Sequence, residues 1–311
     1  MTAQSAVGGS SAAAPPWDGV VDPAALHAML GANDLCILDC RFDLAQPDLG
    51  QEQFTQGHIA RAQYVSLDRD LSGPKTGSNG RHPLPDRSAL AQRCAAWGIG
   101  PGTQVVVYDA SDGSYAARAW WLLRWLGHAA VAVLDGGWPA WLAAGYAVSR
   151  DSAPVRPARF VAGRTLQTVA ELASVQAYAA AALAGRAAPA SGALVLDARA
   201  PDRYEGRNET LDPVGGHIPG AHNRFWKLNL DTRGRFKPGA QLRAEYTALL
   251  GARAPAEVIL QCGSGVTACH DALALHLAGL QGAALFPGSW SQWVADPARP
   301  VATGPAPLAP G

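Results

Sequence analysis

The sequence predicts an α/β protein built from two tandem copies of one domain, each a mainly parallel sheet flanked by helices. Short apolar runs of strand length alternate with longer segments whose apolar residues recur every three to four positions. Several landmarks recur in the same order in the two halves of the chain. With 311 residues, 48% of them hydrophobic, the chain is long enough for about two domains of ordinary size.

The expected strands are the apolar runs CILD (36–39), VVVY (105–108), AVAVLD (130–135), LVLD (194–197), VILQ (258–261) and AALF (283–286). Helical spacing of apolar residues covers residues 116–126 and 266–280. Strands that are apolar on both faces and alternate with helices imply a parallel sheet. Ligands of such sheets bind beyond the carboxyl ends of the strands, at the strand-to-helix turns.

The internal repeat sets the expected domain boundaries. The paired segments are 36–43 with 194–202, 57–67 with 216–226, 105–127 with 258–280, and 134–141 with 286–293. They predict an N-terminal domain over 19–152 and a C-terminal domain over 165–300. Residues 153–164 are rich in Pro and Arg and are expected to be a linker, and 1–18 and 301–311 are expected to be flexible tails.

Composition excludes several classes of function. Lys plus Arg equals Asp plus Glu, and this balance argues against nucleic acid or an anionic membrane as the main partner. There is no apolar run of membrane-spanning length, and the N-terminus lacks the pattern of a signal peptide. Five cysteines without a CxxC motif predict neither a disulfide framework nor a zinc site, and we expect no metal or cofactor. A reducing cytoplasm is the expected compartment.

The segment VILQCGSGVT (258–267) carries the strongest chemical signal. It places Cys262 at the end of a strand and ahead of a helix, where backbone N–H groups and the helix dipole favour anions. Gly263 and Gly265 leave those amides uncovered, so the loop is expected to form an anion-binding nest around an acidified, nucleophilic thiol. The first copy has Asp109 at the equivalent position and is therefore expected to be non-catalytic.

The repeat, the GHIPGA motif (216–221) and above all CGSGVTA (262–268) resemble the two-domain rhodanese-type sulfurtransferases, over nearly the whole chain. The resemblance implies two rhodanese-like domains and a persulfide on Cys262, held by Gly263, Ser264, Gly265, Val266 and Thr267. Covalent catalysis of this kind splits transfer into two steps and needs no metal or organic cofactor. The implied acceptor is a thiol, such as that of thioredoxin, or cyanide.

Two observations on the sulfur donor point in different directions. The Gly-Ser-Gly loop resembles that of family members that prefer 3-mercaptopyruvate, in which Ser264, His82 and Asp68 would relay a proton. Those members usually carry two arginines before GHIPGA. Arg203 matches the first, but the segment ETLDPVGG (209–216), where the second would fall, has no arginine, and in this gap the chain resembles thiosulfate-preferring members.

Candidates for a second cation are Arg207, Arg224 and Lys227. We favour 3-mercaptopyruvate because the loop touches the reacting sulfur. Thiosulfate as donor stays an alternative, and so does a non-catalytic carrier or sensor of sulfane sulfur.

Overall fold

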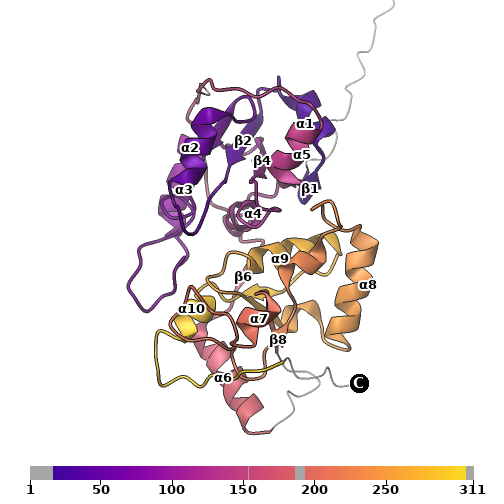
Figure 1. Cartoon of the computed structure of the whole chain (residues 1–311). Helices are drawn as coiled ribbons and strands as arrows, with labels where there is room; N and C mark the ends of the chain where they lie inside the picture. Colours follow the sequence, from indigo (N-terminus) through magenta and orange to yellow (C-terminus); the bar gives the residue numbers. More distant parts are fainter. Residues whose placement is uncertain (1–16, 153, 186–192, 306–311) are drawn as a thin grey trace, which may run out of the picture.

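The computed structural model describes residues 17–152, 154–185 and 193–305. It shows two α/β domains stacked one on the other (Figure 1), each built on a five-stranded sheet. The strand orders are β1-β5-β4-β2-β3 and β6-β10-β9-β7-β8, and the pairings are parallel. The two orders are equivalent position by position, so the predicted fold class of two parallel-sheet α/β domains is confirmed.

The N-terminal domain has the strands β1 (Val20–Val21), β2 (Leu35–Asp39), β3 (Ala62–Tyr64), β4 (Gln104–Tyr108) and β5 (Val131–Leu134). Its helices are α1 (Pro23–Met29), α2 (Leu49–Gln56), α3 (Arg87–Ala96), α4 (Ala116–Trp125) and α5 (Gly137–Ala143).

The C-terminal domain has the strands β6 (Thr168–Val169), β7 (Leu194–Asp197), β8 (His222–Asn223), β9 (Val258–Gln261) and β10 (Ala284–Leu285). Its α-helices are α6 (Leu172–Leu183), α7 (Pro201–Tyr204), α8 (Gly239–Leu250), α9 (Ala268–Leu277) and α10 (Ser289–Trp293). Two 3₁₀ turns complete it, η1 (Trp226–Asn229) and η2 (Pro255–Glu257).

The six strands expected from apolar runs are present, and β1, β3, β6 and β8 are additional. The additional strands lie at the sheet edges and contain only two or three residues, too few to show a periodic pattern. The helix expected over 266–280 begins only at Ala268 and ends at Leu277. This later start lengthens the loop that follows β9, where Cys262 lies.

Helices α4 and α9 lie between the two sheets and pack against each other across the domain interface (Figure 1). Residues 116–124 of α4 are buried, and so are residues 268–275 of α9. A helix that is buried on all sides is apolar at most positions, which accounts for the unusual run AWWLL in α4. Trp120 and Trp121 are both fully buried, and the Trp120 ring lies against His276 of α9, with 5.4 Å between the ring centroids.

The expected tails are shorter than their predicted bounds. The Trp17 N–H donates to the Gln104 side chain, and the Asp18 carbonyl accepts from the Trp120 indole, so the N-terminal domain begins by residue 17. Ala302 pairs with His217 in a β-bridge, so the C-terminal domain extends past residue 300. The rest of both predicted tails, 1–16 and 306–311, lies outside the described residues.

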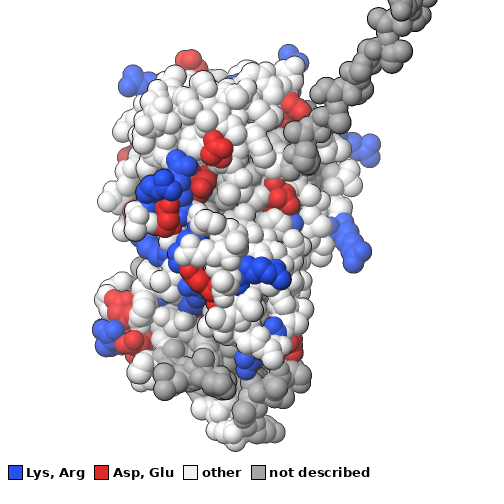
Figure 2. Space-filling model, turned by 90° about the vertical axis from the view of Figure 1, so that its right-hand side faces the viewer, with Lys and Arg blue, Asp and Glu red and all other residues white. Residues whose placement is uncertain are grey.

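The linker runs along the N-terminal domain, where the Gly163 N–H donates to the Leu126 carbonyl. Over the described residues no helix is long and apolar enough to cross a membrane. Acidic and basic side chains are interspersed on the face shown in Figure 2.

Candidate active site

Cys262 lies directly after β9, and its side chain is almost completely buried, with 2% of the residue exposed. Its backbone N–H donates to Ser289 Oγ at 3.1 Å, and its carbonyl accepts from the Trp290 N–H at 3.0 Å. These two bonds fix the loop against the start of α10. Ser289 itself has a positive φ of 52°, a conformation that L-residues rarely adopt.

Gly265 is required by the geometry of this loop. Its φ is +76°, and a Cβ built on it would lie 2.3 Å from the Pro287 carbonyl oxygen. Any other residue would push the loop away from the segment that precedes α10. The loop conformation therefore depends on the second glycine of Gly-Ser-Gly.

The loop presents a row of backbone N–H groups without acceptors. Within the described part of the chain, the N–H groups of residues 263–267 donate to no backbone or side-chain acceptor. They follow Cys262 directly in the chain and lead into the N-terminus of α9, where the helix dipole adds positive potential. Such an arrangement is suited to an anion supplied from outside.

The N-terminal domain contains the same turn with its anion built in. The fully buried Asp109 carboxylate accepts the N–H groups of Ser111, Gly113, Tyr115 and Ala116 at 2.8–2.9 Å. Burial raises the pKa of Asp109 above its ordinary value, although the four N–H bonds oppose this shift. The chain thus shows in one domain that this turn binds a carboxylate, and in the other that the turn is open beside a thiol.

The structure brings the predicted Ser264, His82 and Asp68 together across the domain interface. Ser264 Oγ lies 2.8 Å from His82 Nδ1, and His82 Nε2 lies 3.6 Å from Asp68 Oδ1. Asp68 also pairs with Lys75 Nζ at 3.2 Å. The hydrogen bond from Ser264 to His82 is well formed, whereas the contact from His82 to Asp68 is longer than a normal hydrogen bond.

His82 is neutral at physiological pH. The residue is 3% exposed, and burial lowers the pKa of its imidazole to about 3, although Asp68 opposes the shift. A neutral ring that donates from Nε2 towards Asp68 leaves Nδ1 as an acceptor for the Ser264 hydroxyl. In that tautomer the Ser264 hydroxyl donates to His82 and keeps its oxygen lone pairs free for a proton of the donor.

Arg118 ties the two halves of the site together. This fully buried residue of α4 donates from Nη1 to the Gly265 carbonyl and from Nη2 to the His82 carbonyl, both at 3.1 Å. It therefore sets the position of the loop and of the histidine in relation to each other. The sequence signal was an arginine, one of two with Arg124, in a helix that is apolar at its other positions, and our sequence reasoning missed it.

Arg203, in the one-turn helix α7, lines the pocket beside Cys262. A Cβ on Gly263 would lie 3.5 Å from Arg203 Nη2 and 3.7 Å from Nη1. A second guanidinium lies beside it: Arg81 Nη2 is 3.0 Å from the same point. Arg81 comes from the N-terminal domain and was also missed, although it directly precedes the predicted His82.

The other predicted cations lie elsewhere, which corrects the assignment of Arg207 as a substrate-binding residue. Its side chain is 64% exposed and pairs with Glu205, because it follows the end of α7 on the outer surface. Arg224 is buried and binds Glu245 and Asn229, so its charge is used inside the domain. Lys227 pairs with Asp112 at an exposed position.

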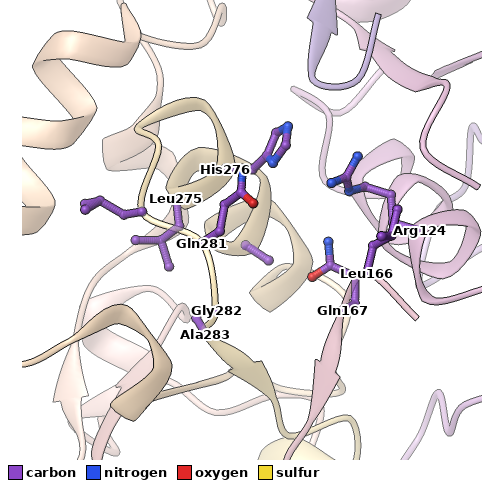
Figure 3. Close-up of a pocket in the computed structure, with 10 residues that line it drawn as sticks. Arg124, Leu166, Gln167, Leu275, His276, Gln281, Gly282 and Ala283 are labelled. Carbon is purple, nitrogen blue, oxygen red and sulfur yellow. The ribbon is translucent and has the colours of Figure 1, made fainter. Parts of the chain in front are cut away.

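Arg81, Arg203 and the cysteine loop enclose a pocket between the domains. Its walls are Leu44, Arg81, Ser114, Tyr115, Arg203, Leu211 and five residues of the cysteine loop, Cys262, Gly263, Ser264, Val266 and Thr267. A second hollow at the interface is lined by Arg124, Gln167 and His276 among others (Figure 3) and contains no residue of this loop. Among the described residues no cluster of side chains has the composition of a metal site.

Comparison with known proteins is consistent with this geometry. The model of the rhodanese-like domain family matches twice, at residues 22–144 and 178–296. A protein of Pseudomonas aeruginosa named "Probable 3-mercaptopyruvate sulfurtransferase" is 46% identical over 90% of this chain and 96% of its own length. A Mycobacterium tuberculosis protein whose name assigns it to the thiosulfate sulfurtransferases, SseB, is 39% identical over 92% of this chain and 98% of its own.

Among solved structures, the chain is similar to SseA of Escherichia coli, described as a 3-mercaptopyruvate sulfotransferase with the rhodanese fold. That match has a TM-score of 0.72 and 27% identity, and covers 88% of this chain and 99% of the other. The 3-mercaptopyruvate sulfurtransferase of Leishmania major matches with a TM-score of 0.73 and 29% identity, over 88% of this chain and 73% of the other.

Proposed function

The chain belongs to the rhodanese-like domain family and is a sulfurtransferase, and on this premise we propose that it transfers sulfur from 3-mercaptopyruvate through a persulfide on Cys262. The observation that carries the proposal is the open row of N–H groups beside Cys262, in contact with a neutral Ser264–His82 pair. Together they provide a nucleophile, an anion cradle and a site for one proton.

In the first step the Cys262 thiolate attacks the sulfur of the donor. An S–S bond forms, the donor's C–S bond breaks, and its electron pair leaves on carbon as the enolate of pyruvate. The proton of the donor thiol passes to that carbon through the Ser264 hydroxyl, which is hydrogen-bonded to His82. The products are pyruvate and an anionic persulfide on Cys262, so the charge of the reactants is conserved.

The backbone N–H groups of residues 263–267, which we call the cradle, stabilise the persulfide anion. The N–H groups of residues 263–267 surround the sulfur that carries the negative charge, as their counterparts surround the Asp109 carboxylate. In the second step a thiolate or cyanide attacks the outer sulfur. The S–S bond breaks, its electron pair returns to Cys262, and the acceptor leaves as a persulfide or thiocyanate.

The proton-handling pair favours 3-mercaptopyruvate over thiosulfate. Thiosulfate releases sulfite, a stable anion that needs no proton, whereas 3-mercaptopyruvate releases a carbanion equivalent that does. The hydrogen bond of 2.8 Å between Ser264 and His82 therefore has a role with only one of the two donors. Thiosulfate is the second candidate because a relative that is 39% identical carries its name.

Paired steady-state kinetics test this proposal. We expect a higher kcat/KM with 3-mercaptopyruvate than with thiosulfate, loss of turnover with both donors in Cys262→Ser, and loss with 3-mercaptopyruvate alone in Ser264→Ala. A higher kcat/KM with thiosulfate would overturn the donor assignment. If the wild type turns over neither donor, the proposed reaction is overturned and a non-catalytic carrier or sensor of sulfane sulfur is favoured.

The compartment and the acceptor are also part of the proposal. Cys36, Cys40, Cys94, Cys262 and Cys269 are free thiols, which suits a reducing compartment such as the cytoplasm. The acceptor we propose is a small thiol, the thiol of a thioredoxin-like protein, or cyanide.

A further inference from the structure

We propose that Arg81 of the N-terminal domain and Arg203 of the C-terminal domain form a two-guanidinium site that binds the carboxylate of a 2-oxo acid donor. The inference rests on the proposed function, and it assigns the second donor-binding cation that the segment before GHIPGA lacks. The site is divided between the domains, so it exists only when they are packed together.

Both guanidinium groups lie over the residue next to the nucleophile. The Cβ position of Gly263 is 3.0 Å from Arg81 Nη2 and 3.7 Å from Arg203 Nη1. Gly263 has no side chain, so nothing separates these nitrogens from its backbone. A donor whose sulfur meets Cys262 would place its carboxylate within reach of both arginines.

Two buried carboxylates, which do not line the pocket, form ion pairs with the two arginines. Arg81 Nη1 pairs with Asp212, and Arg203 Nε and Nη2 pair with Glu209 at 3.1 and 2.7 Å. The Asp212 and Glu209 side chains are only 4% and 3% exposed, whereas those of Arg81 and Arg203 are 27% and 21% exposed. The arginines therefore line the pocket, and the acids do not.

Each arginine keeps one nitrogen for a ligand. Among the described residues, Arg81 Nη2 and Arg203 Nη1 donate to no protein acceptor, and Arg81 Nε is buried without a partner. The backbone of the segment that carries Arg81 is held in place as well, because the Arg81 N–H donates to Ser291 Oγ at 3.0 Å. The two unpaired Nη groups can each donate to one oxygen of a planar carboxylate.

The charges of the site favour a carboxylate over a dianion. Two arginines and the two acids behind them sum to about zero, so the site attracts by directed hydrogen bonds rather than by net charge. A dianion such as thiosulfate gains little from it. The segment ETLDPVGG (209–216), which lacks the second arginine, supplies the two acids that orient Arg81 and Arg203.

The test uses alkylation of Cys262 by two reagents that differ in one carboxylate. Iodoacetate and iodoacetamide are reacted with the full-length protein, and the modified Cys262 peptide is quantified by mass spectrometry. We expect Arg81→Gln to lower the ratio of the iodoacetate rate to the iodoacetamide rate by about 10- to 100-fold, the effect of losing a hydrogen bond to a charged group. The matched control is Arg207→Gln, which should leave the ratio unchanged because Arg207 is exposed and paired with Glu205.

An unchanged ratio of the iodoacetate rate to the iodoacetamide rate in Arg81→Gln would overturn the inference, whether or not both rates fall. Arg81→Gln leaves the buried Asp212 with only its longer contact to Arg203 Nη2, at 3.7 Å, so Arg81→Lys is the second variant if the first does not fold. It keeps a charge for Asp212 but loses the free Nη2, and the same fall in the ratio is expected.

Kinetics separate this inference from the proposed function. With 3-mercaptopyruvate, Arg81→Gln should raise KM by a similar factor and largely preserve kcat. If the wild type turns over 3-mercaptopyruvate and the Arg81 variants keep both its KM and the alkylation ratio, only this inference fails. If the wild type does not turn over 3-mercaptopyruvate but the ratio still falls, the carboxylate site stands and the proposed donor is wrong.

Discussion

The Asp109 carboxylate offers a direct test of what the strand-to-helix turn of this fold does for an anion. Asp109→Ala removes the acceptor of four backbone N–H groups in a fully buried turn. Each N–H left without a partner costs about 1–3 kcal/mol. Removing the buried charge and admitting water offset part of this sum, and we expect a net loss of about 3 kcal/mol.

The loss of unfolding free energy is measured from the unfolding transition of the N-terminal domain, with heat and with denaturant. A loss of this size lowers Tm by about 6–12 °C in a domain of this length. Asp109→Asn should fall between the wild type and Asp109→Ala, because its amide keeps one oxygen for Ser111 and Gly113 but turns an NH₂ group towards the other two N–H groups. Asp48→Ala is the matched control, since Asp48 is 84% exposed and should change the stability little.

Rescue by a small carboxylate makes the test specific. Formate added to Asp109→Ala at about 100 times its Kd should recover about 2.7 kcal/mol, and it should not affect the wild type, in which the turn is occupied. An Asp109→Ala variant within about 0.5 kcal/mol of the wild type, with no effect of formate, would refute the account of the cradle.

Three further predictions concern the active site. Gly265→Ala should reduce turnover more than about 100-fold at near-native circular dichroism, whereas Gly77→Ala, also at positive φ but in open space, should keep activity; an active Gly265→Ala would contradict the loop geometry. The His82 pKa is about 3 in the folded chain and ordinarily 6.5, so the unfolded chain binds the extra proton between these values and stability is lost as pH falls below 6.5. His82→Gln should therefore remove about 1.4 kcal/mol per pH unit from the acid-side slope of the unfolding free energy, and an unchanged slope would show that the ring is not buried neutral. Arg118→Lys should lower kcat with little change in KM, because its guanidinium positions Gly265 and His82 without touching the donor, and a wild-type kcat would contradict that role.

The sequence predicts the cysteine loop well because every determinant is local. The apolar run of β9, the cysteine, the two glycines and the start of α9 follow one another within about a dozen residues. Local backbone geometry then fixes the direction of the N–H groups without help from distant parts of the chain. The same holds for Asp109, which occupies the equivalent turn of the first domain.

Of the two arginines that we propose bind the donor, Arg203 was predicted, but Arg81 could not be, because the two meet only through the packing of the domains. Arg81 and Asp212 are far apart in the sequence and come from different domains, yet they form an ion pair beside Cys262. Arg207 lies closer in sequence to the GHIPGA motif (216–221) than Arg81 does. The chain leaves α7 in a direction that points Arg207 to the outer surface. Position relative to a motif is therefore a poor guide to cations in an interdomain pocket.

Edge strands and domain ends show a related limit. β6 and β8 contain two residues each and depend on the neighbouring strand for their hydrogen bonds. Trp17 and Ala302 lie in segments whose composition suggests tails, but each is held by a partner distant in sequence, Gln104 and His217. Such contacts leave no periodic pattern to read.

The central claim is that Cys262 carries the transferred sulfur, and the most direct measurement is the mass of its peptide after one turnover without acceptor. Wild-type protein is mixed with 3-mercaptopyruvate, trapped with an alkylating reagent, digested and analysed, with pyruvate measured in parallel. We predict one added sulfur atom on the Cys262 peptide, an equal amount of pyruvate, and neither in Cys262→Ser. Sulfur found on Cys269 or another cysteine, or pyruvate released without sulfur on Cys262, would contradict the account.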